Sequence, residues 1–190
     1  MRMQGWFTLA CLVVTLTLAV VACGPAALLS GWQQATWEYP AVCLLLAMAH
    51  LGFLGWNWPP ARMFMGDAGS IPTGFLLAVL ALQGALTGQL PLACWLILLA
   101  PFITDASYTL VWRMTTGQAF TRPHRLHGYQ RLSRRWGGHR PVVLLLLAVE
   151  FLWLIPLATL SVWCAGYQQL LVILAYFPLV CGMVKAANFA

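Results

Sequence analysis

The sequence predicts an all-α integral membrane protein with about six transmembrane helices, and three observations lead to this fold class. The composition is very apolar, the apolar residues form long continuous runs, and the positive charges recur on alternate connections between the runs. Hydrophobic residues make up 62% of the 190-residue chain and charged residues only 7%, whereas a soluble domain carries about 25% charged residues. Because so few polar groups cannot cover a folded surface, we expect lipid to surround this chain.

Six apolar segments account for most of the chain, and we interpret residues 1–190 as a single membrane domain. Most of the segments have about the 20 residues that are needed to cross a bilayer. They are continuous and do not alternate with a period of two, which favours helices that satisfy their own backbone hydrogen bonds. The predicted spans are residues 6–29, 39–56, 71–86, 90–112, 141–164 and 168–184.

The positive charges then predict the topology. With six spans, the two ends of the chain and the loops 57–70 and 113–140 lie on one side of the membrane. These regions hold all ten Lys and Arg residues, and the opposite side holds none. The positive-inside rule makes the charged side cytoplasmic. We therefore expect a multi-pass protein whose termini and two basic loops are cytoplasmic.

The N-terminus allows one alternative. Arg2, the apolar stretch after it and the sequence VVACG at positions 20–24 resemble a secretory signal that ends at a lipobox, with Cys23 as the lipidated residue. The apolar run continues past Cys23 to residue 29, which favours a membrane span. All six cysteines lie within apolar runs and none forms a CxxC pair, so we expect buried thiols rather than a metal or disulfide site.

The loop 57–70 carries the first candidate site. Asp67 lies within FMGDAGS at positions 64–70, directly before the predicted third span, and Ser70 can cap that helix. A helix N-terminus offers free N–H groups to an anion. A carboxylate beside it suits Mg²⁺, which bridges carboxylates to phosphate oxygens. The alternative is a capped turn with a solvated Asp67.

Two further acids and one histidine lie inside predicted spans. Asp105 is a candidate functional residue because an ionisable group inside a membrane is costly; the alternative is a structural contact with another helix or with an arginine. For Glu150 a structural polar contact is at least as good an interpretation. For His50 we expect a buried histidine with its hydrogen bonds satisfied.

The loop 113–140 carries the second candidate site. His124, Arg125 and His127 combine guanidinium groups, which bind phosphates bidentately, with imidazoles that titrate near neutrality. The alternative is a polybasic segment that lies on anionic lipid headgroups. Nucleic acid is not an expected partner, because the basic patch lies in a short loop at a membrane. Since both loops are predicted on one face, together they indicate a membrane-surface site for a phosphorylated substrate.

The two loops resemble a known family. The sequence at 57–70 is similar to the FMGDxGS signature of the polyprenyl-phosphate N-acetylhexosamine-1-phosphate transferases, the glycosyltransferase 4 family, which includes the phospho-MurNAc-pentapeptide transferase. HRLHGYQ at positions 124–130 resembles the His-rich cytoplasmic loop of this family, in the form found in the branch that starts O-antigen and related surface polysaccharides. The two motifs occur in the family's order.

The resemblance implies a phospho-sugar transferase of a bacterial inner membrane. It implies transfer of a sugar-1-phosphate from a UDP-sugar to undecaprenyl phosphate with release of UMP, which initiates synthesis of O-antigen or another surface polysaccharide. Mg²⁺, or Mn²⁺ in its place, would bind the diphosphate, with Asp67 as the catalytic or metal-side carboxylate. The implied diphosphate contacts are His124, Arg125, His127 and Ser70, and Asp105 and Asn57 are further candidates.

The chain also departs from the family's pattern. The paired Asp-Asp motif and the NxxNxxDGxDG motif are absent, and the only acids are Glu38, Asp67, Asp105 and Glu150. We therefore expect a fragment of a larger polytopic transferase fold, covering its C-terminal part, with little activity alone. A second copy of the chain or a complementing N-terminal half is an expected partner. The alternative is a non-catalytic membrane subunit or scaffold that binds anionic lipid or a partner protein.

Overall fold

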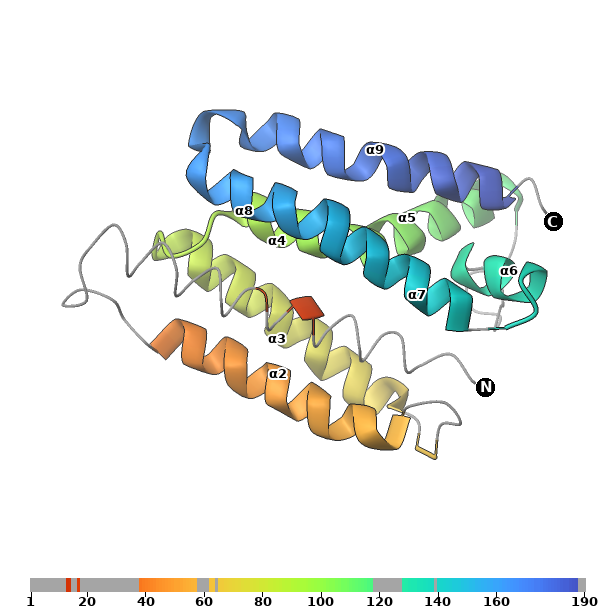
Figure 1. Cartoon of the computed structure of the whole chain (residues 1–190), viewed down its shortest axis with the longest axis horizontal. Helices are drawn as coiled ribbons and strands as arrows, with labels where there is room; N and C mark the ends of the chain where they lie inside the picture. Colours follow the sequence, from red (N-terminus) through yellow and green to blue (C-terminus); the bar gives the residue numbers. More distant parts are fainter. Residues whose placement is uncertain are drawn as a thin grey trace. The chain divides into compact units, whose positions relative to one another are not determined.

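A computed structural model describes residues 38–57, 62–63, 65–117, 128–138 and 140–187, together with Val13, Val14 and Thr17. Within these residues the regular structure is entirely helical, which confirms the all-α prediction. The chain divides into two compact units. Unit 1 comprises residues 1–95 and 161–163, and unit 2 comprises residues 96–160 and 164–190. Figure 1 labels the helices of each unit.

Unit 1 is built on a pair of packed helices, α2 (Glu38–Asn57) and α3 (Gly66–Leu86). Figure 1 shows them side by side in orange and yellow. The buried residues of α2 recur every three or four positions, as expected for one face of a helix; they are Tyr39, Pro40, Cys43, Ala47, His50, Leu54 and Asn57. Those of α3 are Thr73, Leu77, Leu80, Ala81 and Gly84. A single apolar face of each helix thus meets its neighbour.

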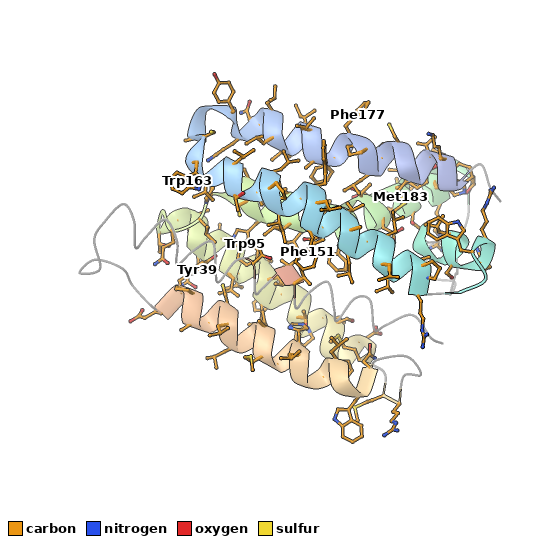
Figure 2. The ribbon with its side chains drawn as sticks, viewed as in Figure 1. Tyr39, Trp95, Phe151, Trp163, Phe177 and Met183 are labelled. Carbon is orange, nitrogen blue, oxygen red and sulfur yellow. The ribbon has the colours of Figure 1, made fainter. Side chains whose placement is uncertain are left out.

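A buried tyrosine joins three helices of unit 1. The Tyr39 hydroxyl donates a hydrogen bond to the Leu80 carbonyl oxygen at 3.0 Å. The same hydroxyl accepts one from the Trp95 indole N–H at 3.1 Å, and Trp95 belongs to α4 (Leu92–Leu98). Figure 2 labels both rings. The hydroxyl approaches the backbone of α3 at Gly84, where the missing side chain leaves room for it.

Unit 2 centres on α5 (Ala100–Thr115), which packs along α9 (Gln168–Ala187). The hydroxyl of Tyr176 on α9 donates a hydrogen bond to the Leu96 carbonyl oxygen at 3.1 Å. A short helix, α6 (Gly128–Arg135), contacts α5, α7 and α9. The next span consists of α7 (Arg140–Val149), the π-helical turn η1 (Glu150–Leu154) and α8 (Ile155–Trp163), and a 3₁₀ turn, η2 (Ala165–Tyr167), leads into α9.

The described helices match five of the six predicted spans. Four are long and apolar enough to cross a membrane by themselves: Glu38–Asn57, Gly66–Leu86, Arg140–Trp163 and Ala165–Lys185. The predicted span 90–112 is broken: α4 and α5 meet at Leu99 with a bend of 68° and count as a fifth span if taken together. Pro101 lies in the first turn of α5 and lacks the N–H that would continue α4. The predicted first span, with Cys23, lies outside the described residues apart from Val13, Val14 and Thr17.

The outward faces of these helices are apolar. Leu45, Ile71, Leu152 and Phe177 are between 67% and 77% exposed, and Phe177 points away from α9 in Figure 2. Exposed apolar surface on this scale is found where a protein meets lipid or a partner. Together with the apolar helices it supports a multi-pass membrane protein.

Two element boundaries differ from the prediction. Helix α3 begins at Gly66 and not at residue 71, so Asp67 and Ser70 lie inside it. Ser70 therefore does not cap the helix: the N-cap residue is Met65, which makes no side-chain capping hydrogen bond. In the expected loop 113–140, Arg113 belongs to the last turn of α5 and residues 128–135 form α6.

Candidate functional site

The connection between α2 and α3 folds back onto the end of α2. The amide N–H of Arg62 donates a hydrogen bond to the Trp56 carbonyl oxygen at 2.9 Å. The Asn57 side-chain amide donates to the Met63 carbonyl oxygen at 2.8 Å, and Asn57 is fully buried. Sequence reasoning proposed Asn57 as a substrate contact. In this fold its side-chain amide holds the connection that precedes Asp67, and its part in substrate binding stays a prediction.

Two glycines shape the start of α3. Gly66 has a φ of +58°, in the left-handed region that favours glycine, and it turns the chain directly into the helix. At Gly69 an added Cβ would overlap the Cγ atom of Met65. The glycines of the FMGDAGS sequence thus have local backbone and packing roles. Together they allow Asp67 to sit in the first helical turn.

Asp67 is exposed and lies in the first turn of α3, where helical N–H groups have no acceptor within the helix. Ser70 is half-buried three residues later, on the same side of the helix. The positive end of the helix dipole and these N–H groups favour an anion at this position. The site therefore presents one accessible carboxylate beside a helix N-terminus.

A magnesium ion at Asp67 stays a prediction, because the described residues supply a single exposed carboxylate there. No group of three or more His, Cys, Asp or Glu side chains could hold a metal ion within the described part of the chain. Mg²⁺ commonly binds one or two carboxylates and completes its shell with substrate phosphates and water. The exposed carboxylate of Asp67 can supply such a ligand, so the donor set suits Mg²⁺ bound together with a diphosphate.

In unit 2, α5 carries a buried polar row. Asp105, Thr109 and Arg113 follow one another at intervals of four residues and so share one face of the helix. Each is at most 6% exposed, as is the neighbouring Thr104. The hydroxyl oxygens of Thr104 and Thr109 have no hydrogen-bond partner among the described residues. Asp105 is thus buried inside a span as expected. Arg113 was assigned to the loop, although its spacing from Asp105 and Thr109 already indicated the helix.

Glu150 begins the π-helical turn η1 and is only 4% exposed. Its Oε1 atom has no hydrogen-bond partner in the described part of the chain. Single π-helical turns inside α-helices are frequent at functional sites. His50 in unit 1 is buried, as expected, and its Nδ1–H donates to the Leu46 carbonyl oxygen at 2.7 Å. Its Nε2 atom has no partner among the described residues, so the histidine is only half satisfied.

The residues proposed from the His-rich loop are not part of this geometry. His124, Arg125 and His127 lie outside the described residues. Their role as diphosphate contacts and their approach to Asp67 therefore stay predictions. The end of the HRLHGYQ sequence, residues 128–130, forms the first turn of α6.

Comparison with known proteins bears on the segment that holds Asp67. Residues 3–85 match the family model described as glycosyl transferase family 4. This stretch includes α2 and the FMGDAGS sequence and ends one residue before the last residue of α3. The resemblance to glycosyl transferase family 4 is confirmed. It is a partial match, because residues 86–190 lie beyond the family model.

Individual relatives align over a longer stretch. The chain is 28% identical over 123 residues to the probable undecaprenyl-phosphate N-acetylglucosaminyl 1-phosphate transferase of Bacillus subtilis (strain 168), which covers 64% of this chain and 34% of the relative. It is 33% identical over 129 residues to the phospho-N-acetylmuramoyl-pentapeptide-transferase of Desulforapulum autotrophicum, or 66% of this chain and 34% of that relative. The chain thus spans about a third of the length of these curated relatives. No solved structure matches it.

Proposed function

We propose that the chain is part of an enzyme that transfers a sugar-1-phosphate from a UDP-sugar to undecaprenyl phosphate. An oxygen of undecaprenyl phosphate attacks the phosphorus of the sugar-phosphate group. The bond from that phosphorus to the oxygen that bridges to UMP breaks, and UMP leaves. The product would be the first lipid-linked sugar of O-antigen or another cell-surface polysaccharide. The relatives named above carry out transfers of this kind according to their names.

The observation that carries this proposal is the placement of Asp67. It is exposed in the first turn of α3, within the segment that matches the family, and the Asn57 hydrogen bond fixes the loop before it. The α3 N-terminus offers N–H groups to one phosphate, and the Asp67 carboxylate offers a ligand to Mg²⁺, or to Mn²⁺ in its place. The bound metal would offset the negative charge of the diphosphate. Ser70 lies three residues after Asp67 on the same side of α3 and would contact the same diphosphate.

The basic loop completes the proposal. His124, Arg125 and His127 would contact the diphosphate from the cytoplasmic side. The one-sided placement of all ten Lys and Arg residues supports an inner-membrane location with both termini and both loops in the cytoplasm, where UDP-sugars are made. Asp105, which is buried in α5 beside Thr109 and Arg113, is a further candidate. We propose that it positions other groups and does not contact the substrate.

We also propose that this 190-residue chain turns over slowly by itself. Only four carboxylates occur in the whole sequence, and two of them, Asp105 and Glu150, are buried within spans of unit 2. One exposed carboxylate at the candidate site is few for a phosphoryl transfer that depends on metal and charge placement. Further acidic groups would come from a complementing N-terminal half or from a second copy of the chain.

Binding and turnover test the two parts separately. The purified chain should bind UDP-N-acetylglucosamine only when Mg²⁺ is present, and Asp67→Asn should weaken this binding at least about tenfold, since even an indirect partner of a metal commonly contributes 10–100-fold. Glu38→Gln, which removes an exposed acid at the other end of α2, is the matched control and should bind normally. Absence of Mg²⁺-dependent binding would refute the site.

Release of UMP with undecaprenyl phosphate present measures the second part. Little release is expected from this chain. Rapid release that Asp67→Asn abolishes would uphold the reaction and overturn the claim of slow turnover.

A non-catalytic subunit or scaffold is the second candidate function, and one observation favours it. Helix α6 is short, strongly amphipathic and basic, with Arg134 and Arg135 exposed in its last turn. Such helices lie in the membrane interface and attract anionic lipid. If nucleotide binding fails while lipid binding by α6 persists, the scaffold is the better description of the chain.

A further inference from the structure

One end of unit 2 is basic on its outer surface. Arg134 and Arg135 of α6, Arg140 at the start of α7 and Lys185 in the last turn of α9 are all exposed. Because α6 contacts both α7 and α9, these four cations belong to one region, which we call the basic end. Figure 1 shows α6 beside the start of α7 and the C-terminal end of α9.

No acid lies in this region within the described part of unit 2. The acidic side chains of the unit are Asp105, ten residues before the end of α5, and Glu150, ten residues after the start of α7. At 1.5 Å per residue they are about 15 Å from the ends of the helices. The basic end therefore carries a net positive charge at its surface, and a ligand that matches it must be anionic.

The surroundings of the cations identify the class of ligand. Trp136, directly after α6, is 44% exposed, and tryptophan is enriched where membrane meets water. Large apolar side chains are exposed within one or two helical turns of the cations: Met114, Leu144 and Val184. A small soluble anion would leave these side chains in water. A lipid covers them with its acyl chains while its headgroup meets the cations.

Helix α6 has one side packed on unit 2 and one side exposed. Ser133 is buried and Leu132 is half-buried, whereas Arg134 and Arg135 face outward. An eight-residue helix of about 12 Å is too short to cross a bilayer. With one side on unit 2 and a basic side outward, it has the character of an interfacial helix.

We propose that the basic end of unit 2 is a docking surface for anionic phospholipid headgroups of the membrane leaflet. Its cations hold the headgroups, and α6 lies in the plane of the interface between the ends of α5, α7 and α9. This inference does not depend on the transferase proposal, because it concerns bulk phospholipid and involves neither Asp67 nor the nucleotide.

Native mass spectrometry of the full chain tests this proposal, in micelles doped with equal amounts of phosphatidylglycerol and phosphatidylcholine. The wild type should retain phosphatidylglycerol preferentially. Each basic residue near an anionic surface contributes about fivefold in affinity, so the double variant Arg134→Gln/Arg135→Gln should lower the preference by roughly 25-fold. Arg134→Lys/Arg135→Lys should keep most of it, because the charge is retained.

A matched control removes the same charge elsewhere. Arg62→Glu changes the net charge by two units, as the double glutamine variant does, but in the α2–α3 connection of unit 1, and it should keep the preference. Equal loss in Arg62→Glu would show that overall charge matters and would overturn a local surface. Loss in the double lysine variant, or displacement of phosphatidylglycerol by UDP-N-acetylglucosamine, would assign the arginines to a specific phosphate site and also overturn it.

A salt titration of the wild type tests the proposal without depending on whether the variants fold. If circular dichroism shows that the double glutamine variant loses helical content, the salt titration of the wild type decides whether the basic end binds anionic headgroups. Preference for phosphatidylglycerol should fall steadily as ammonium acetate is raised, since screening weakens attraction between exposed charges. A preference that salt leaves unchanged, or no preference at all, would contradict the proposal.

Discussion

Replacing Gly84 with alanine should destabilise unit 1, because the Tyr39 ring occupies the space that the new methyl group needs. An ideal Cβ on Gly84 would lie 2.9 Å from Tyr39 Cζ and 3.3 Å from Cε2, and closer still to the hydroxyl oxygen. The ring is not free to move away. Its hydroxyl holds the Leu80 carbonyl at 3.0 Å and the Trp95 indole at 3.1 Å.

The magnitude follows from three contributions. Overpacking a filled site costs about 1–3 kcal/mol, and each hydrogen bond that the displaced hydroxyl loses costs about 1 kcal/mol. Alanine returns about 1 kcal/mol through its higher helix propensity. We expect Gly84→Ala to lower the free energy of unfolding by about 2 kcal/mol if one hydrogen bond is lost and about 3 kcal/mol if both are.

Gly74→Ala is the matched control in the same helix. Nothing lies within 4 Å of a Cβ at Gly74, so this change should be neutral or stabilise the chain. Unfolding of the purified chain in mixed micelles with rising sodium dodecyl sulfate, followed by circular dichroism, compares the two variants. Tyr39→Phe removes the hydroxyl, and in that background Gly84→Ala should cost less, which a double-mutant cycle measures. Equal unfolding of Gly84→Ala and Gly74→Ala would refute this packing argument.

Three further predictions concern the loop before and within the start of α3. Gly66→Ala should cost about 1–2 kcal/mol of stability because alanine disfavours the left-handed backbone, and it should also weaken Mg²⁺-dependent UDP-N-acetylglucosamine binding; unaltered unfolding and binding would contradict this. Asn57→Ala should cost about 1–3 kcal/mol and speed hydrogen exchange in the connection that contains Met63, which mass spectrometry detects; an unchanged exchange rate would show that Asn57 does not anchor the loop. Asp67→Asn should leave the unfolding free energy within about 0.5 kcal/mol of wild type, since the side chain is exposed; a larger loss would mean that Asp67 has a structural role.

The spans could be predicted from the sequence because they depend on one property that each residue carries, its hydropathy. The apolar run 39–56 corresponds almost residue for residue to α2. The start of α3 was placed five residues late because Gly66 and Asp67 do not look helical in sequence. The positive φ of Gly66 and the Gly69–Met65 contact, which begin the helix there, depend on backbone geometry.

Interruptions of the spans were harder to predict. The break at Leu99 has a sequence signal in Pro101, which apolar composition conceals. The π-helical turn at Glu150 has no comparable signal, because an extra residue in a helical turn depends on packing with its neighbours.

In the candidate site, too, some features follow from the sequence and others depend on the folded structure. The sequence motif singles out Asp67 and the structure places it, exposed, in the first turn of α3, while its chemical role stays a prediction. The role of Asn57 could not be predicted, because its partner is a backbone carbonyl, that of Met63, which only the folded loop brings into reach. Arg113 was missed although its four-residue spacing from Thr109 and Asp105 extends the helix. Polar residues at helical spacing are the sequence signal for this row.

The central claim is that Asp67 and a bound nucleotide diphosphate together hold a divalent metal ion. Electron paramagnetic resonance with Mn²⁺ in place of Mg²⁺ tests it most directly, because free and protein-bound Mn²⁺ give different signals. We expect a bound Mn²⁺ signal only when UDP-N-acetylglucosamine is present, and we expect Asp67→Asn to lose it. Equal amounts of bound Mn²⁺ in wild type and Asp67→Asn would show that Asp67 does not hold the metal.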